Sequence, residues 1–245
     1  MRKPLIGINP YFFHHNDTNW NGTKERYYQS VARGGGIPVT LHYPTKEHSV
    51  AEIAAHLDGL MMVGGDDLAP DLYGSKNTEL VLKPYITSER ERFDRAIFES
   101  MLEAGKPVLA ICVGMQHINV ILGGDLIEDI NTLMPNHIDH GVFNGPWAEH
   151  EVTLYNDSQI AKIMGTINPT VASTHHQGIR SLGNGLKAEG ESADGLIEAI
   201  TLQDYPDQVI AVQWHPELLN DRPEQIALFK WLSNRAKTNK LKRTL

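Results

Sequence analysis

The sequence predicts an α/β fold in which a mainly parallel, open sheet is flanked by helices and extended by a small antiparallel portion. Three observations support this prediction. In the first half of the chain, short apolar runs alternate with helical patterns, as in successive βαβ units. Residues 107–111 (PVLAI) are apolar throughout, which is typical of a parallel strand buried on both faces. In the second half, short predicted strands follow one another across tight turns, which indicates antiparallel pairing.

The elements of the first half are separated by glycines. Gly34 follows the first predicted helix, Gly64 and Gly65 end the third strand, and Gly105 ends the third helix. The segment 66–87 is polar and turn-rich, which is the character of an active-site loop. The strands are expected at 4–9, 37–43, 59–63 and 107–111, and the helices at 24–33, 48–57 and 88–104.

The second half is predicted to hold shorter strands and one closing helix. Residues 223–236 (PEQIALFKWLSNRA) have the apolar spacing of an amphipathic helix. No internal repeat, low-complexity segment or linker interrupts the chain, so we expect a single domain over residues 1–245. The strands are expected around 150–155, 169–173, 186–191, 195–201 and 208–214.

The composition is that of an ordinary globular protein, with 41% hydrophobic and 21% charged residues among 245. No apolar run reaches the roughly 18 residues that a membrane-spanning helix needs. The apolar segment 5–8 is too short for the core of a signal peptide, and no small-residue cleavage site follows it. We therefore expect a soluble, cytoplasmic protein that does not engage a membrane.

Charge and cysteine content exclude two further classes. The net charge is −8, and the basic cluster at 237–243 is typical of a solvated helix end, so nucleic-acid binding is not expected. Because Cys112 is the only cysteine, an internal disulfide and a Cys-rich zinc site are excluded. A single cysteine is more often a buried apolar residue than a catalyst, so its surroundings must decide between these two interpretations.

Cys112 lies at a predicted turn from strand to helix. The surrounding sequence, PVLAICVGMQHINVILGG, matches the G-x-S-x-G nucleophile elbow, with Cys in place of Ser and Ala110 in place of the first Gly. Small residues at Ala110 and Gly114 let the strand and the helix approach closely. The turn lifts the Cys112 side chain above the carboxyl edge of the sheet, where open α/β folds bind ligands. The start of the helix favours a thiolate, so we interpret Cys112 as a nucleophile.

Two backbone N–H groups are candidates for an oxyanion hole beside Cys112. Val113 follows the nucleophile directly, so its N–H points towards an oxyanion on an attacked carbonyl. A second donor is expected from another loop. Gly65, at the end of the predicted strand 59–63, is the best candidate, because a glycine lets the backbone come close to the substrate.

A candidate base and its orienting partner follow the predicted strand 208–214. The sequence there reads QVIAVQWHPE, so His215 lies just beyond the strand and Pro216 prevents the strand from continuing. If this strand neighbours the one before Cys112, His215 can serve as the general base. Glu217 can accept the other ring N–H of His215 and so fix its tautomer and orientation.

Four motifs together resemble the class I glutamine amidotransferase superfamily and, within it, the γ-glutamyl-γ-aminobutyrate hydrolase group, assigned to peptidase family C26. Residues 110–116 (AICVGMQ) and 213–217 (QWHPE) are similar to the superfamily's nucleophile and base motifs. Residues 59–74 (GLMMVGGDDLAPDLYG) resemble that group's Gly-Gly-x-Asp-x-x-Pro-x-x-Tyr-Gly loop, and 171–179 (VASTHHQGI) its Ser-x-His-His-Gln segment. The resemblance runs from about residue 4 to 236 and implies a class I glutamine amidotransferase-like, flavodoxin-like three-layer fold.

The resemblance implies that Cys112 attacks the γ-carbonyl of a glutamyl amide, releases the amine and forms a γ-glutamyl thioester that is then hydrolysed. It also implies a role in polyamine catabolism. By their motif positions, Gln116 would contact the glutamyl moiety, while His175, His176 and Gln177 would line the substrate site.

One position departs from the family pattern. The Arg that commonly follows the nucleophile is Val113 here. The backbone N–H remains, so oxyanion stabilisation is retained, but any contact of the Arg side chain is lost. The sequence therefore leaves the identity of the leaving amine open.

No metal ion or other cofactor is expected. The chain has twelve histidines, including His14 and His15 in a polar loop and His137, His140 and His150 around a Gly/Pro-containing segment. None of them stands in an HExxH or Cys/His spacing. Histidines without such a complement are more often solvated or hydrogen-bonded than metal-binding.

Three functions stay open on the sequence alone. The leading hypothesis is a stand-alone hydrolase of small γ-glutamyl amides. The first alternative is a glutaminase subunit that supplies ammonia to a separate synthase, and the second is a non-catalytic ligand-binding or sensor protein on the same scaffold. The combination of Cys112, His215 and Glu217 favours an enzyme over the last of these. The oligomeric state is also open, with a homodimer as one option.

Overall fold

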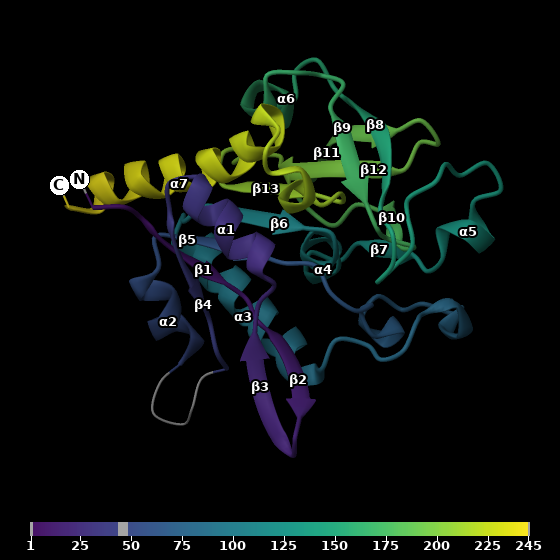
Figure 1. Ribbon diagram of the computed structural model, residues 1–245, viewed down its shortest axis with the longest axis horizontal. Helices are drawn as coiled ribbons and strands as arrows, with labels where there is room; N and C mark the ends of the chain where they lie inside the picture. Colours follow the sequence, from purple (N-terminus) through teal and green to yellow (C-terminus); the bar gives the residue numbers. More distant parts are fainter. Residues whose placement is uncertain (1, 44–48, 245) are drawn as a thin grey trace.

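The parallel half of the sheet carries the two strands that precede the candidate nucleophile and base. The computed structural model describes residues 2–43 and 49–244, with side chains as far as residue 238. Five strands lie side by side and parallel in the order β4-β1-β5-β6-β13 (Figure 1). Every residue of β5, β6 and β13 is buried, as expected for parallel strands covered on both faces. The bounds are β1 (Leu5–Ile8), β4 (Ile37–Thr40), β5 (Gly59–Met62), β6 (Val108–Ile111) and β13 (Val209–Val212).

The antiparallel half extends the same sheet from β13. The strand order continues β13-β12-β11-β8-β9, each strand antiparallel to the one before it. A further strand, β10, pairs with β12 and with β7. The bounds are β7 (Asp125–Ile127), β8 (Ala148–Leu154), β9 (Thr170–Ser173), β10 (Gly178–Ser181), β11 (Leu186–Ser192) and β12 (Ile197–Leu202).

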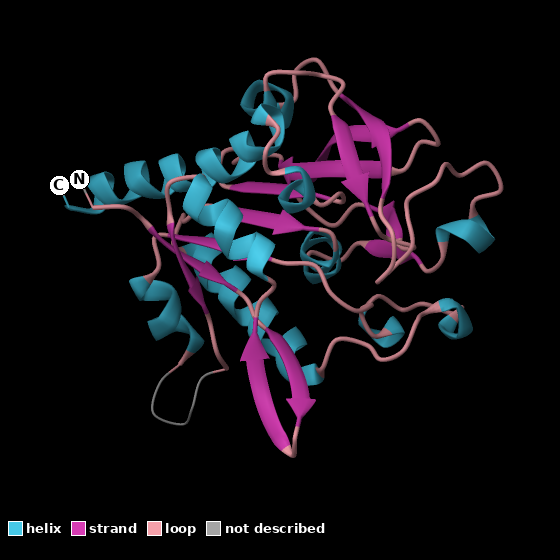
Figure 2. Ribbon diagram, in the orientation of Figure 1, coloured by secondary structure: helices cyan, strands magenta, loops and turns pink. Residues whose placement is uncertain are grey.

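Helices cover both faces of the parallel half. Figures 1 and 2 show α1 and α7 packed together in front of the strands, while α3 and α4 lie behind them and α2 packs against α3. The predicted fold class, a mainly parallel sheet between helices with an antiparallel portion, is therefore confirmed. The bounds are α1 (Glu25–Arg33), α2 (Val50–His56), α3 (Ser88–Glu103), α4 (Val113–Ile121), α5 (Ile130–Leu133), α6 (Gln159–Met164) and α7 (Pro223–Thr244).

Several local predictions differ from the structure. The start of the predicted helix 48–57 at His48 lies outside the described residues. The predicted loop 66–87 contains two short 3₁₀ turns, and the closing helix runs well beyond residue 236. The short elements β7, α5, α6 and β10 were not expected from the sequence. The 3₁₀ turns are η1 (Pro70–Leu72), η2 (Thr78–Leu80) and, after β13, η3 (Pro216–Leu219).

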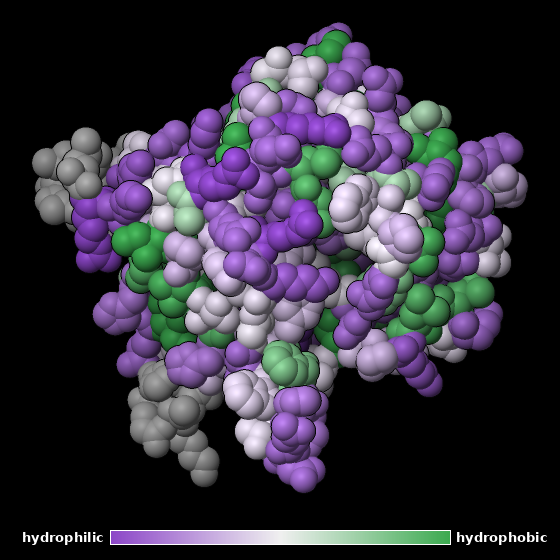
Figure 3. Space-filling model, viewed as in Figure 1, coloured by the Kyte–Doolittle hydropathy of each residue, from purple (hydrophilic) through white to green (hydrophobic). Residues whose placement is uncertain are grey.

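The prediction of a polar loop around His14 and His15 is wrong, because these residues belong to a β-hairpin. Strands β2 (Tyr11–His15) and β3 (Thr18–Gly22) pair antiparallel across a two-residue turn. Both turn residues, Asn16 and Asp17, have φ near +50°, the conformation that matches the twist of a tight hairpin and that Asn and Asp tolerate. The tip of this hairpin is hydrophilic in the space-filling view (Figure 3), and its polar residues concealed the strand pattern.

Among the described residues, no helix is long and apolar enough to cross a bilayer. The expectation of one domain over residues 1–245 stays a prediction.

Candidate active site

Cys112 occupies a strained turn between β6 and α4. Its backbone has φ 53° and ψ −114°, a left-handed conformation that is unusual for a residue with a side chain and that marks nucleophile elbows. The Cys112 N–H donates to the carbonyl of Val212 on the neighbouring strand β13 at 2.8 Å. A Cβ at Gly114 would lie 2.6 Å from the carbonyl oxygen of Met62, so only glycine lets α4 approach β5 this closely. The predicted need for a small residue at this position therefore has a steric cause.

His215 and Glu217 follow β13, the parallel neighbour of β6. In the register of the two strands, Val212 lies opposite Ile111, so both strands end at the same edge of the sheet and deliver Cys112 and His215 to one place. The Nδ1 atom of His215 lies 2.6 Å from Oε1 of Glu217, and the Glu217 side chain is almost fully buried. This contact fixes the ring and leaves its Nε2 atom for the nucleophile.

The electrostatics of the pair favour a charged imidazole. Burial opposes protonation of His215, but the Glu217 carboxylate and the Cys112 side chain, which hydrogen-bonds to the ring, outweigh it and raise the pKa of His215 well above its usual value. An imidazolium beside a cysteine is the arrangement that enzymes with a cysteine nucleophile use, because the thiolate is the reactive form. The arrangement can therefore carry out nucleophilic attack on a carbonyl at neutral pH.

A cavity of about 310 Å³ opens beside this pair. Cys112, His215, Glu217 and Gly65, all predicted as site residues, lie in its wall. The rest of the wall comes from residues that were not predicted individually as site residues, although the sequence leaves the pocket shape to segments that include 11–23 and 132–150. These residues belong to β2, to the start of α1 and to the loop before β8, and comprise Tyr11, Lys24, Arg26, Tyr27, Phe143, Asn144, Gly145 and Trp147, with Thr174 and Leu218.

Two of the unpredicted groups are cations at the cavity wall. Lys24 Nζ lies 5.4 Å from the ring centre of Tyr11, and the guanidinium of Arg26 lies 6.0 Å from that of Trp147. Both side chains are exposed. They give this side of the cavity a positive character, although the chain as a whole is acidic, so the cavity suits a ligand with a carboxylate. The only signal in the sequence was their position at the start of a predicted helix.

Tyr11 and Tyr27 supply buried hydroxyl groups on the same side. Burial raises the pKa of both, well beyond the range in which they could ionise at neutral pH, and the nearby Glu217 and Cys112 add to the effect. Both therefore remain neutral donors next to the negatively charged part of the site.

Gly65 and Val113 face a smaller cavity that also touches Cys112. A side chain at Gly65 would collide with the guanidinium of Arg90. Arg90 is buried and donates to the carbonyl oxygens of Val63 at 3.0 Å and Gly64 at 2.8 Å, so it holds the backbone that leads into Gly65. The assignment of the two backbone N–H groups to an oxyanion hole stays a prediction, with both residues beside the nucleophile as it requires.

Residues 175–177 line the smaller cavity as well. His176 is held between two carboxylates, with Nε2 at 2.9 Å from Asp67 and Nδ1 at 3.3 Å from Asp129. Burial opposes a charge on this ring, but the two carboxylates prevail and raise its pKa. The two carboxylates therefore hold the His176 ring in place and favour its charged form at the edge of the site.

The other predicted substrate contacts are tied into the protein. Gln116 donates from Nε2 to the carbonyl of Gln177 and to Oε1 of Gln213, both at 3.1 Å. His175 borders the cavity, but its Nδ1 lies 3.0 Å from the carbonyl of Gln177 and its Nε2 faces Glu198 at 3.6 Å. The structure thus places these residues together beside Cys112, and their contacts with substrate stay predictions.

Comparison with known proteins places the chain among relatives of one family. A family model described as Peptidase C26 matches residues 4–217. A provisionally named glutamine amidotransferase-like protein of Rickettsia prowazekii is 29% identical, over 96% of this chain and 98% of its own. The γ-glutamyl-γ-aminobutyrate hydrolase PuuD of Escherichia coli is 30% identical, over 89% and 87% of the two chains. A provisionally named GMP synthase component of Thermoplasma acidophilum shares the fold, with TM-score 0.69 at 16% identity over the whole of both chains.

Proposed function

Because the chain belongs to the Peptidase C26 family and is a glutamine amidotransferase-like hydrolase, we propose that it hydrolyses γ-glutamyl amide bonds of small molecules such as γ-glutamyl-γ-aminobutyrate. The observation that carries the proposal is the meeting of Cys112, on its strained elbow, with the His215–Glu217 pair at the end of the adjacent strand.

The proposed reaction proceeds through a thioester. The Cys112 thiolate attacks the γ-carbonyl carbon, and the oxyanion is stabilised by the N–H groups of Gly65 and Val113. His215 gives its proton to the departing amine as the C–N bond breaks. It then takes a proton from a water molecule, which attacks the thioester and releases glutamate and the free thiol.

The cavity supports a small, anionic substrate. A volume of about 310 Å³ is at the lower end of the range for small-molecule sites. A γ-glutamyl compound carries an α-carboxylate, and a γ-aminobutyrate leaving group carries a second one. We assign the recognition of such a carboxylate to Lys24 and Arg26 at the wall of the cavity. A role in polyamine catabolism in the cytoplasm would follow from this substrate.

A substrate panel tests the proposal. The purified protein is assayed for release of glutamate from γ-glutamyl-γ-aminobutyrate, from a γ-glutamyl amide with an uncharged amine, and from glutamine, with Cys112→Ala as the negative control. We expect the highest kcat/KM for γ-glutamyl-γ-aminobutyrate. Preference for glutamine that requires a second protein would favour the glutaminase alternative, and the absence of any turnover would favour a binding protein.

The role of Arg26 is tested with one variant and a matched control. Arg26→Ala is expected to raise KM for γ-glutamyl-γ-aminobutyrate by more than it raises KM for the amide with an uncharged amine. Arg92→Ala, at an exposed arginine of α3 that does not line the cavity, is the control. Equal effects of Arg26→Ala on the two substrates would remove Arg26 from recognition of the leaving group.

A further inference from the structure

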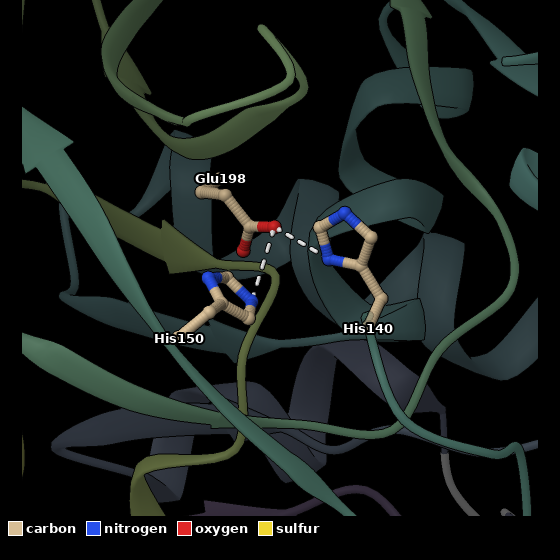
Figure 4. Close-up of side chains that lie close together, drawn as sticks. All are labelled: His140, His150 and Glu198. Carbon is tan, nitrogen blue, oxygen red and sulfur yellow. Dashed lines mark ion pairs between the residues drawn. The ribbon is translucent and has the colours of Figure 1, made fainter. Parts of the chain in front are cut away.

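Three histidines and one glutamate converge in the antiparallel half, and one of them, His175, belongs to the segment 175–177 that borders the smaller cavity. Glu198 lies on β12 and its side chain is completely buried. The side chains of His140, His150 and His175 are only 3%, 8% and 2% exposed. In Figure 4, His140 and His150 approach the Glu198 carboxylate from two different segments of the chain. These four residues form the His–Glu cluster, which the function proposed above does not use.

The distances within the His–Glu cluster fit a bound metal ion better than direct hydrogen bonds. Oε1 of Glu198 lies 3.4 Å from Nδ1 of His140, 3.6 Å from Nε2 of His175 and 4.0 Å from Nε2 of His150. Ligand atoms at about 2.0–2.2 Å from a tetrahedral Zn²⁺ lie roughly 3.3–3.6 Å from each other. The carboxylate oxygen and the ring nitrogens of His140 and His150 all lie within 4.8 Å of one another, and this group of three does not include His175. His175 joins it through its contact with Glu198, so both His150 and His175 must move to bind one ion.

The outer ring nitrogens fix the protonation of the histidines. Nε2 of His140 lies 3.0 Å from the Asp194 carboxylate, while Nδ1 of His150 and Nδ1 of His175 lie 3.1 and 3.0 Å from backbone carbonyls. Because all three partners are acceptors, the outer nitrogen carries the hydrogen in the neutral form of each ring, and the inner nitrogen then presents a lone pair towards Glu198. A carboxylate that supports a metal-binding histidine in this way is a common feature of metal sites.

In the interior of the His–Glu cluster, the inner ring nitrogens and the Glu198 carboxylate are therefore hydrogen-bond acceptors that face one another. Nδ1 of His140, Nε2 of His175 and both carboxylate oxygens of Glu198 are buried without a hydrogen-bond partner among the described residues. Only the hydroxyl of Ser173, 2.9 Å from Nε2 of His150, can offer a proton. A buried carboxylate opposite several lone pairs is costly unless a cation lies between them.

We propose that His140, His150, His175 and Glu198 bind one divalent transition-metal ion, Zn²⁺ in the first place. Imidazole nitrogens and a single carboxylate suit zinc, whereas Mg²⁺ prefers oxygen ligands. The alternative cation is a proton on one ring. The test below separates the two, because a protonated ring gives neither bound Zn²⁺ nor a Co²⁺ spectrum. This proposal departs from the expectation, based on the sequence, that no metal is bound.

The position of the site indicates what the ion does. His140 and His150 flank the loop that carries Phe143 and Trp147 into the wall of the substrate cavity. His175 lies next to His176, which borders the smaller cavity. An ion at this place would fasten two walls of the substrate site to β12. Since four protein ligands leave no open position, the ion is structural rather than catalytic.

Metal binding by the full-length chain tests the proposal directly. The protein is stripped with a chelator, dialysed and titrated with Zn²⁺, with Mg²⁺ as the control ion, and bound metal is counted by mass spectrometry. We expect one Zn²⁺ per chain and no Mg²⁺, with a higher thermal midpoint for the zinc form. Co²⁺ in place of Zn²⁺ is expected to give the visible absorption bands of tetrahedral coordination.

Variants locate the ion. Glu198→Gln and His150→Ala are expected to lose the bound metal and the Co²⁺ spectrum, whereas His56→Ala, at an exposed histidine on α2, keeps both. If Glu198→Gln does not fold, the His150→Ala variant and the wild-type titration still decide. Absence of stoichiometric Zn²⁺ in the wild-type chain, or its full retention in His150→Ala, would overturn the proposal. Neither readout depends on hydrolase activity, so failure of the proposed function would leave this test intact.

Discussion

Two histidine–carboxylate pairs in this molecule begin in the same way and lead to different chemistry. Nδ1 of His215 lies 2.6 Å from Glu217, and Nε2 of His140 lies 3.0 Å from Asp194. In each pair the carboxylate fixes one ring nitrogen and aims the other. The second nitrogen of His215 is left for Cys112, which lines the same open cavity, whereas that of His140 faces Glu198 in a closed interior.

The surroundings shift the pKa values of His215 and His140 in opposite directions. Burial acts against the charged form of both. For His215, Glu217 and Cys112 overcome burial and raise the pKa. For His140, burial prevails with the help of His175, and the pKa is lowered. A carboxylate partner therefore orients a histidine in either case, but the other groups around the ring decide whether its charged or its neutral form is favoured.

The largest expected effect is the loss of hydrolase activity when Cys112, the partner of His215, is replaced. Cys112→Ala removes the nucleophile, and glutamate release from γ-glutamyl-γ-aminobutyrate is expected to fall by about 10⁴-fold or more. The Zn²⁺ content and the thermal midpoint are expected to stay close to those of the wild type, because Cys112 is not one of the proposed metal ligands. Activity within tenfold of the wild type would remove Cys112 from the mechanism.

Glu217→Gln is expected to lower activity less than loss of the nucleophile does, since the orienting member of a triad usually contributes less. The loss of activity should be smaller than that of Cys112→Ala by a factor of roughly 10 to 100. The pH profile gives a second readout. Glu217 raises the pKa of His215, so the imidazolium persists to high pH and activity falls only as the pH rises through that pKa. Without the carboxylate, the fall is expected at lower pH. An unshifted alkaline limb would contradict this role for Glu217.

Asp194→Asn makes the corresponding change in the other pair. Loss of a carboxylate behind a metal-binding histidine typically weakens metal binding by about 10- to 100-fold. We expect this loss for Zn²⁺, measured by competition with a chelator, together with a rise in KM and little change in kcat, because the ion holds the cavity walls and not the nucleophile. The reverse pattern, a lower kcat with normal Zn²⁺ affinity, would make the two pairs functionally alike.

Much of the catalytic half could be predicted from the sequence because its signals are local. The apolar run before Cys112, the glycine after it and the proline after His215 each constrain a few neighbouring residues. Their meeting then follows from the rule that parallel strands end at one edge of the sheet.

The rest depends on contacts between distant segments. Lys24 and Trp147 reach the cavity from different parts of the chain, and no short pattern shows that they meet. One signal was available for the His–Glu cluster. Glu198 interrupts the apolar strand IEAITL, and a charged residue in a buried strand requires a partner.

A third histidine–carboxylate contact, outside both sites, gives the smallest expected effect. Glu91 on α3 lies 3.6 Å from Nε2 of His117 and 2.7 Å from Arg95. His117 and Arg95 outweigh partial burial and lower the pKa of Glu91 to about 2. A carboxyl group with a lowered pKa stabilises the fold above its unfolded-state value of about 4.3, and this contribution is lost as the pH falls towards 2.

Glu91→Gln removes that contribution. At pH 7 the thermal midpoint is expected to fall by roughly 2–4 °C, and the difference from the wild type should shrink as the pH is lowered from about 5 towards 2. Glu99→Gln, on the exposed side of the same helix, is the control. Activity and Zn²⁺ content should be unchanged, because His117 faces neither the nucleophile nor the His–Glu cluster. A difference from the wild type that does not depend on pH would show that the substitution acts through packing rather than through charge.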